Sequence, residues 1–402
     1  MTYPIIFNVL AILASAVVLG EIFEQAKIPH VVGELLSGII VGPALLGVVN
    51  TSPELDAVSS VALFFIIFLI GLEMNTEMLR RSIPKSTLVS LTSFLIPLVP
   101  VFALAYLLFP FGSVSGFVMA LAITVPSVSI VSVLVLRFKM IHTATGQIIL
   151  SSVTVSDILA FLFLAVVSQS VGRTLYTVGY LGIFLAAFLA VDWLLNYSPS
   201  ASRKVLARAS GLLKREDVPY AMLIIAGMFM AWLMQAIGIS YILGAFFAGL
   251  LVHEGLVGKK AFKKVTGTLE TMNRAFFIPL FFGLAGIQVN LRGDNLFLFL
   301  ALALLIAVDV ASSMYLSYAA AKSLLKIREE GGPRRMAAIM GGRGSVGIII
   351  ATFSLGQGLI NGTVYSLIVL ATMVISLVTP FIMGRGDVVK EKERVPSGLP
   401  GP

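Results

Sequence analysis

Three ionisable side chains lie within long apolar stretches that otherwise avoid charge: Asp157, Asp309 and Arg343. A charge near the centre of a bilayer costs at least about 2.5–3.5 kcal/mol, so such residues usually mark ion or proton pathways. Burial favours the protonated form of a carboxyl group, whereas a nearby cation favours the ionised form. A single buried carboxylate at Asp157 can therefore hold a proton or a cation in turn. This competition is sufficient chemistry for exchange, provided that the empty, charged form cannot cross.

Hydroxyl side chains accompany Asp157 on its own stretch and on the stretch before it. Oxygen ligands suit hard cations such as Na⁺ or K⁺, and three histidines with no cysteine offer no transition-metal cluster. The predicted ion-binding residues are Asp157, Ser156, Thr124, Ser127, Ser129, Ser152 and Thr154. Asp157 is the residue expected to exchange cation and proton, and no cofactor is expected. The alternative is that Asp157 pairs with Arg343 as a buried strut.

The other buried charges favour structural roles. A buried guanidinium needs a carboxylate or several carbonyls, so we expect Arg343 to form an ion pair with Asp309 or Glu73 rather than to act in transport. Asp309 is either that counter-ion or a second proton carrier. Glu34 is a candidate for an access path. The three histidines, His30, His142 and His253, are expected at the inner interface as ordinary interfacial residues rather than pH sensors.

The elements that must position these residues are apolar helices. The chain is 58% hydrophobic and 12% charged, with a mean hydropathy of +1.01, against roughly 25% charged residues in a soluble domain. A spanning helix needs about 20 largely apolar residues, and the apolar runs are continuous rather than alternating. The sequence predicts an all-α polytopic membrane protein with thirteen transmembrane helices, near 5–25, 31–49, 57–75, 86–109, 114–136, 144–170, 175–197, 219–237, 239–257, 275–290, 296–321, 335–357 and 361–383.

Basic residues gather on one side of this predicted topology. With the N-terminus outside, the inner loops and the tail hold 25 of the 28 lysines and arginines. Cytoplasmic loops collect these residues, which predicts an external N-terminus and a cytoplasmic C-terminus in a plasma or inner membrane. The basic runs are then solvated loops rather than a nucleic-acid surface. Residues 1–384 are expected to form the membrane domain, and residues 385–402 a disordered cytoplasmic tail.

Three pairs of segments indicate an internal repeat. "IPHVVGELLSGIIV" pairs with "ISYILGAFFAGLLV", "FLIGLEMN" with "GLAGIQVN", and "SVSI" with "SVGI", each about 211–218 residues apart. The offset relates helices 1–6 to helices 8–13, with 1–197 holding the first repeat plus a connector helix and 218–384 the second. An odd number of helices separates the halves, so the repeat is inverted, as in secondary transporters.

The third pair falls on the two most interrupted helices. Helix 5 contains Pro126, which removes a backbone donor, and helix 12 contains four glycines between Gly341 and Gly347. Broken helices at corresponding positions of two halves point to a midplane ion site, so we expect helices 5 and 12 to cross there. The alternative is an ordinary proline kink and a glycine packing face.

Five further stretches are distinctive: "IPHVVGELLSGIIVGPALLGVV", "LFFIIFLIGLEMNTEMLRRS", "TVPSVSI", "YILGAFFAGLLV" and "RGSVGIII". Through these motifs, and over residues 5–384, the chain resembles the Kef-type and NapA-type members of the monovalent cation:proton antiporter-2 family. It implies a homodimer of thirteen-helix subunits, each with a dimerisation domain and a six-helix core domain that moves like an elevator. Asp157 matches the ion-binding aspartate of the family, Thr124 and Ser127 its broken-helix polar positions, and Arg343 an arginine on the second broken helix.

Departures from the family pattern bear on charge stoichiometry. Electrogenic members carry an acidic pair on helix 6 and a lysine on helix 11; here the pair is Ser156-Asp157, and helix 11 has Asp309 and no lysine. Ser345 stands where the family often has an acidic residue. No cytoplasmic nucleotide-binding domain of the Kef type is expected within these 402 residues. With one titratable site carboxylate, we expect one Na⁺ (or K⁺, with Li⁺ also possible) to exchange for one H⁺, electroneutrally.

The sequence therefore favours an electroneutral antiporter serving pH homeostasis, and not an enzyme. A sodium-coupled symporter of organic anions with the same architecture, a passive cation channel and a transport-dead sensor remain as alternatives. Membrane lipid is expected around the protein, and no nucleic acid is expected as a partner.

Overall fold

The computed structural model describes residues 5–26, 28–73, 76–138, 140, 143–168, 179, 182, 218–237, 240–252, 259–290, 296–327 and 331–384. Throughout these ranges the regular secondary structure is helical, apart from one isolated β-bridge. The helices are α1 (Ile5–Gln25), α2 (His30–Val41), α3 (Pro53–Glu73), α4 (Thr76–Ser90), α5 (Ile96–Leu108), α6 (Gly112–Thr124), α7 (Val128–Arg137), α8 (Ala144–Val167), α11 (Val218–Ala236), α12 (Tyr241–Leu251), α14 (Lys259–Met272), α15 (Ile278–Ile287), α16 (Leu296–Ala319), α17 (Gly332–Met340), α18 (Ser345–Gly356) and α19 (Gly362–Gly384). Three π-helical turns adjoin them: η1 (Leu91–Leu95), η2 (Asn273–Phe277) and η3 (Ala320–Leu324).

The helices overlap the predicted segments, apart from the segment at 175–197, which lies almost wholly outside the described residues. Two predicted starts are wrong. The helix predicted from 86 begins at Thr76, and the helix predicted from 275 begins at Lys259 because α14, η2 and α15 follow one another without a break. Both extensions are rich in charge, so an apolar-length criterion misses them. Six helical stretches in the described part are long and apolar enough to cross a membrane.

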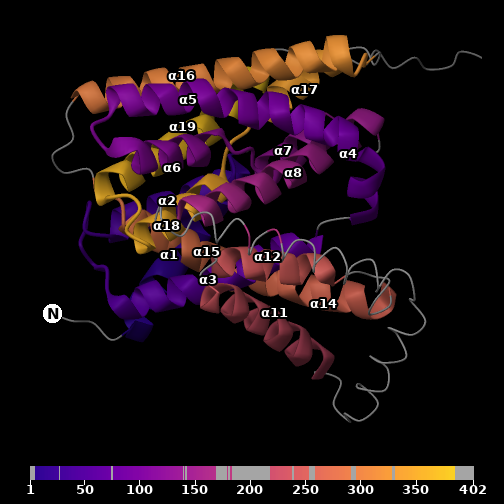
Figure 1. The fold of residues 1–402 in the computed structure, drawn as a ribbon. Coiled ribbons are helices and arrows are strands. Elements are labelled where there is room, and N and C mark those ends of the chain that lie inside the picture. Colours follow the sequence, from indigo (N-terminus) through magenta and orange to yellow (C-terminus); the bar gives the residue numbers. More distant parts are fainter. Residues whose placement is uncertain are drawn as a thin grey trace, which may run out of the picture.

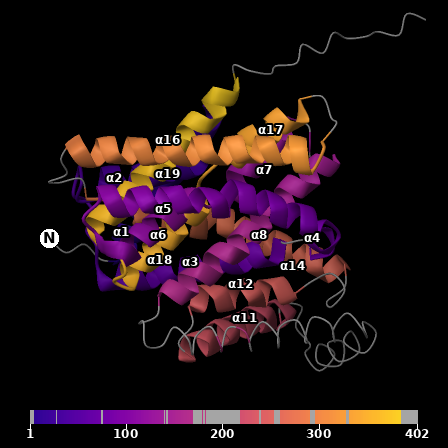
Figure 2. The same ribbon diagram turned by 45° about the horizontal axis from the view of Figure 1, so that its top comes forward.

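The helices form layers, as the two ribbon views show (Figures 1 and 2). α16 lies along α5 on one side of the molecule, and α3, α11, α12 and α14 lie on the opposite side. Between them run α6, α7, α8, α18 and α19, which include both halves of the first interrupted helix (α6 and α7) and the second half of the other (α18); its first half, α17, packs against α16. The two breaks and Asp157 therefore lie in the interior of the bundle.

Glycine permits the closest helix contacts. A Cβ at Gly347 of α18 would overlap the carbonyl oxygen of Ala122 in α6, and one at Gly38 of α2 would overlap the carbonyl oxygen of Gly283 in α15. Small residues let backbones approach closely where lipid supplies no hydrophobic drive between helices. These glycines therefore fix how closely α18 packs on α6 and α2 on α15.

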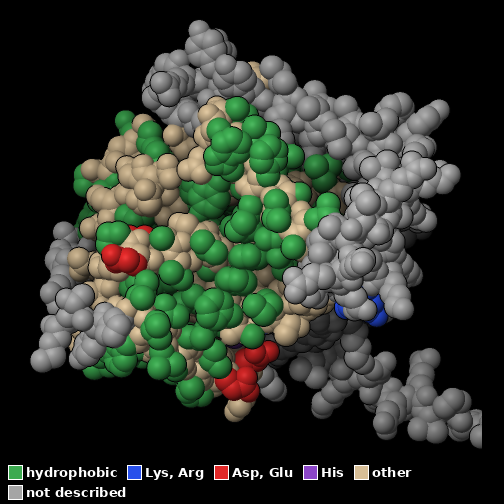
Figure 3. All heavy atoms as spheres, turned by 90° about the horizontal axis from the view of Figure 1, so that it is seen from below, with side chains coloured by type: hydrophobic (Ala, Val, Ile, Leu, Met, Phe, Trp, Pro, Cys, Tyr) green, Lys and Arg blue, Asp and Glu red, His purple; other side chains and the backbone are tan. Residues whose placement is uncertain are grey.

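The outer surface is suited to lipid. Viewed from below, the described surface consists mostly of hydrophobic side chains, with charged ones in a few places toward its edges (Figure 3). α11 exposes Ile225, Phe229 and Trp232, and α1 exposes Ile6 and Leu10. Such a surface is stable only in an apolar solvent, in agreement with a multi-pass membrane protein.

Candidate functional site

The two helix breaks meet each other. α6 ends at Thr124 and α7 begins at Val128, while α17 ends at Met340 and α18 begins at Ser345. An isolated antiparallel bridge pairs Pro126 with Arg343, and the backbone N–H of Ser127 donates to the carbonyl oxygen of Gly342 at 3.2 Å. The interruptions predicted from Pro126 and the glycine run thus lie side by side, in extended backbone that is buried within the bundle.

Asp157 is fully buried in the middle of α8, and both of its carboxylate oxygens lack a hydrogen-bond partner among the described residues. α8 packs against α6 and α7, the two halves of the first interrupted helix. A buried carboxylate without partners cannot remain as a bare anion, since it has lost its hydration and gained nothing in return. Asp157 therefore needs a proton or a cation. The alternative that it pairs with Arg343 is wrong.

Ser156 has a partner that the sequence did not reveal. Its hydroxyl lies 2.8 Å from the hydroxyl of Ser90 in α4, and both side chains are fully buried. Ser156 also donates to the carbonyl oxygen of Ser152 at 3.0 Å. Because a hydroxyl has one proton, Ser90 is then the donor to Ser156. The available signal was the spacing of Ser86, Ser90 and Ser93, which puts three hydroxyls on one helix face.

The other predicted ligands lie in the same region without touching the carboxylate. Ser152 donates to the carbonyl oxygen of Ile149 at 2.6 Å and lies 3.6 Å from the sulfur of Met340, which links α8 to α17. The half-buried Thr154 donates to the carbonyl oxygen of Leu150 at 3.3 Å. Within the described residues these hydroxyls are used by the backbone of α8 itself, so none of them hydrogen-bonds Asp157.

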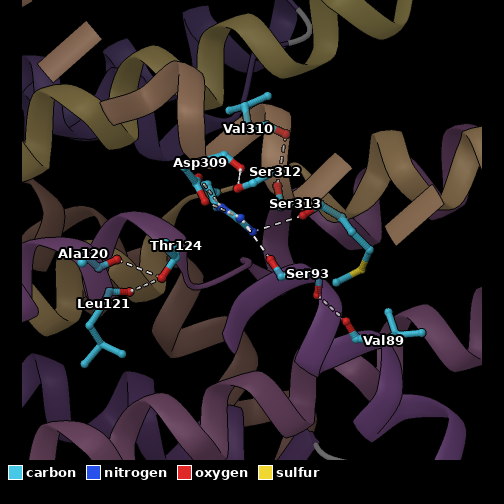
Figure 4. Close-up of polar contacts among 11 residues, drawn as sticks. Val89, Ser93, Ala120, Leu121, Thr124, Asp309, Val310, Ser312 and Ser313 are labelled. Carbon is cyan, nitrogen blue, oxygen red and sulfur yellow. Dashed lines mark hydrogen bonds and ion pairs between the residues drawn. The ribbon is translucent and has the colours of Figure 1, made fainter. Parts of the chain in front are cut away.

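At the breaks, the fully buried Thr124 donates to the carbonyl oxygen of Ala120 at 2.8 Å (Figure 4). The hydroxyl of Ser127 lies 3.2 Å from that of Ser345, so the two interrupted helices also meet through side chains. The side chain of Ser129 lies outside the described residues. The predicted oxygen ligands are thus divided between α8 and the breaks that it packs against.

Arg343 is buried in the break between α17 and α18 and is fully engaged. Its Nε donates to Asp309 Oδ2 at 2.9 Å and its Nη2 to Asp309 Oδ1 at 2.8 Å, a bidentate ion pair with α16. Nη1 donates to the carbonyl oxygen of Met340 at 3.1 Å, and Nη2 also to that of Ser93 at 3.2 Å (Figure 4). Of the two predicted partners, the structure selects Asp309; Glu73 is the last residue of α3 and makes none of these bonds.

The carbonyl of Ser93 is available because of a proline. In an α-helix it would accept from residue 97, but Pro97 has no N–H. The π-helical turn η1 ends two residues before this proline, and the guanidinium of Arg343 donates to the carbonyl oxygen of Ser93. The hydroxyl of Ser376 in α19 donates to the carbonyl oxygen of Arg343 at 2.9 Å. Arg343 therefore ties α16, α5's π-helical start and α19 to the second break.

Glu34 is a second buried carboxyl group. It lies in α2 beside Gly20 of α1, and its Oε2 has no partner in the described part of the chain. No hydrogen bond among the described residues joins the Glu34 side chain to α8, so the predicted access role stays a prediction. His30 begins α2, whereas His142 and His253 lie outside the described residues.

The donor set is suited to a monovalent cation. Among the described residues, no group of three or more His, Cys, Asp or Glu side chains could hold a transition or divalent ion. A single carboxylate, with hydroxyl side chains on the same helix and at the adjoining breaks, suits Na⁺ or K⁺, whose charge one carboxylate neutralises. The same carboxylate can instead take a proton.

Comparison with known proteins agrees with this chemistry. Residues 10–385 match the model of a family described as "Sodium/hydrogen exchanger, transmembrane". The chain is 27% identical to the "Probable Na(+)/H(+) antiporter 3" of Methanocaldococcus jannaschii over 394 residues, covering 95% of each chain. It is also 27% identical to the "Na(+)/H(+)-K(+) antiporter GerN" of Bacillus cereus, covering 94% of this chain and 95% of that protein.

A solved structure shares the fold. The sodium proton antiporter MjNhaP1 from Methanocaldococcus jannaschii superposes with a TM-score of 0.69 over 94% of this chain and 95% of that one, at 15% sequence identity. At this identity the match supports the architecture alone. The resemblance to monovalent cation:proton antiporters seen in the sequence motifs is confirmed by the family match.

Proposed function

From the premise that the chain belongs to the sodium/hydrogen exchanger family, we propose that it exchanges Na⁺ or K⁺ for H⁺ electroneutrally, with cation and proton competing for Asp157. The observation that carries the proposal is the fully buried carboxylate whose two oxygens lack partners, on a helix packed against an interrupted helix. Relatives named as Na⁺/H⁺ and Na⁺/H⁺-K⁺ antiporters support both cations as substrates.

The cation site comprises the Asp157 carboxylate with oxygens of Ser156, Ser127 and Thr124, together with Ser129, Ser152 and Thr154. In the proton-loaded form Asp157 is neutral; in the cation-loaded form the ion replaces the proton. Either form carries no net charge at the carboxylate, whereas the empty anion is held back by the cost of burying it. Because the unoccupied, charged carboxylate cannot cross, a cation moves one way only when a proton moves the other way.

Transport of one cation per proton follows from the remaining charges. α16 contains no lysine, and its only acid, Asp309, is neutralised by the bidentate pair with Arg343. Among the described residues at the breaks, Asp157 is thus the one carboxyl group that is available to change its charge. In this account Arg343 and Asp309 hold the two breaks in register and carry no transported ion.

Larger-scale features complete the proposal. We infer thirteen transmembrane helices in an inverted repeat, with the helices interrupted at Pro126 and at 341–344 crossing at the site. Two subunits form a homodimer in the plasma or inner membrane, with the N-terminus of each outside. The core domain of each subunit moves as an elevator. The family resemblance, the distribution of basic residues and the meeting of the two breaks support this arrangement.

The charge stoichiometry is tested in proteoliposomes carrying the purified protein. A Na⁺ or K⁺ gradient should drive proton movement, which an internal pH dye reports. In the assay driven by Na⁺, the rate should not change when a membrane potential is imposed with valinomycin. Currents on a solid-supported membrane should stay at the level of empty liposomes after the same cation jump. A potential-dependent rate would contradict the one-for-one exchange, and uptake of an organic anion or channel-like conductance would contradict antiport itself.

A further inference from the structure

The hydroxyl of Ser90 in α4 points to another helix, unlike the hydroxyl one turn further along. Ser93 donates to the carbonyl oxygen of Val89 at 2.7 Å, the usual hydrogen bond of a serine within its own helix. The Ser90 hydroxyl instead lies 2.8 Å from that of Ser156 in α8, and both side chains are fully buried. α4 thus places a hydroxyl against the residue that directly precedes Asp157.

The direction of this hydrogen bond follows from the other bond of Ser156. Ser156 gives its single proton to the carbonyl oxygen of Ser152 at 3.0 Å, so Ser90 is the donor and Ser156 the acceptor. A hydroxyl oxygen has two lone pairs, and Ser90 occupies one of them. The orientation of the Ser156 oxygen is therefore fixed from two sides, and its second lone pair is left to a cation.

Ser90 is itself held in place through the second helix break. Three residues further along the same helical segment, the carbonyl oxygen of Ser93 accepts from Nη2 of Arg343 at 3.2 Å. Arg343 is anchored in turn by its bidentate pair with Asp309. The segment from Ser90 to Ser93 therefore connects the buried ion pair to α8, and a charged contact sets the position of Ser90 opposite Ser156.

We propose that Ser90 is a positioning residue for the cation site, which acts through Ser156 and favours Na⁺ over K⁺. The inference rests on the proposed exchange at Asp157 and adds a residue of α4 to it. Selectivity between hard cations of different size depends on the number of oxygen ligands and on how freely they move. A fixed Ser156 oxygen keeps the short ligand distance that the smaller Na⁺ requires, whereas a released one can move back to the longer distance that suits K⁺.

Ser86 supplies a matched control on the same helix. It lies one turn from Ser90, is fully buried, and its hydroxyl has no hydrogen-bond partner among the described residues. Ser86→Ala and Ser90→Ala each remove one buried hydroxyl from α4. Only Ser90→Ala removes the hydrogen bond to Ser156, so a difference between the two variants isolates the effect of that bond.

The test is the apparent KM for Na⁺ and for K⁺, measured together with the maximal rate in proteoliposomes. Ser90→Ala should raise the KM for Na⁺ about three- to tenfold, as expected when one buried hydrogen bond no longer holds a ligand. The KM for K⁺ should rise less, and both maximal rates should be kept because the Asp157 carboxylate is unaltered. Ser86→Ala should leave all four values unchanged.

A double variant shows whether Ser90 acts through Ser156. In Ser156→Ala the acceptor is gone, so adding Ser90→Ala should cause no further rise in the KM for Na⁺. Three results would overturn the positioning role: an unchanged KM for Na⁺ in Ser90→Ala, the same change in Ser86→Ala, or a further rise on the Ser156→Ala background.

An equal rise in KM for Na⁺ and K⁺ would overturn the preference for Na⁺. Failure of the proposed function is distinguishable from these results, since the unmodified protein would then exchange no cation for protons in the same liposomes.

Discussion

Asp157→Asn is expected to reduce cation-driven proton movement to the background of empty liposomes while the protein remains folded. Asparagine has nearly the same shape but can neither bind a transported proton nor neutralise a cation. The Asp157 side chain makes no hydrogen bond in the described structure, so replacing it removes no structural contact. The melting temperature in detergent should therefore stay the same or rise, because a buried ionisable group has been removed.

A matched variant separates the carboxylate from the shape of the site. Asp157→Glu keeps the titratable group but displaces it by one methylene, so it should retain exchange with a raised KM for cation. Full exchange by Asp157→Asn would exclude Asp157 as the carrier. Loss of exchange together with a strongly lowered melting temperature would instead assign a structural role to Asp157.

Asp309→Asn is expected to have the largest effect on stability, about 3–5 kcal/mol, because it leaves the buried guanidinium of Arg343 without its counter-charge. Both members of the pair are almost completely buried, at 1% and 0% side-chain exposure. The melting temperature in detergent should fall by several degrees. At low temperature the folded fraction should still exchange one cation per proton, since Asp309 binds neither of the transported ions in the proposed mechanism.

The double variant Asp309→Asn/Arg343→Gln tests the pairing directly. Removing both charges together should restore much of the lost stability, so the two single effects should be far from additive. Additive effects would show that the two residues act independently. Persistent loss of exchange in a well-folded double variant would assign the pair, or Asp309 as a second proton carrier, to the transport step.

Much of the site was predictable because its chemistry is unusual for a membrane interior. Charged residues are rare in apolar segments, which makes Asp157, Asp309 and Arg343 easy to recognise. Pro126 indicates a helix break because it has no backbone N–H. The pairing of Arg343 with a carboxylate follows from the cost of a lone buried charge, although the choice of Asp309 over Glu73 needed coordinates.

Features that depend on packing between distant segments could not be read from the sequence. Ser90 lies 66 residues from Ser156, and only the packing of α4 on α8 shows that their hydroxyls meet. The carbonyl of Ser93 becomes an acceptor for Arg343 through the combination of Pro97 and the π-helical turn η1. Helix starts at Thr76 and Lys259 were missed because charged helical turns extend beyond the apolar run.

The central claim is that cation and proton compete for one carboxylate, and the pH dependence of the apparent KM for Na⁺ tests it most directly. With the cation and the pH varied on the same side of proteoliposomes, competition at one site predicts that KM rises about tenfold for each unit by which the pH falls, on the acidic limb, because the proton concentration rises tenfold. The maximal rate at saturating Na⁺ should stay constant across that range. If KM instead stayed constant while the maximal rate fell as the pH was lowered, the proton and the cation would bind at different groups. That result would contradict the exchange at Asp157.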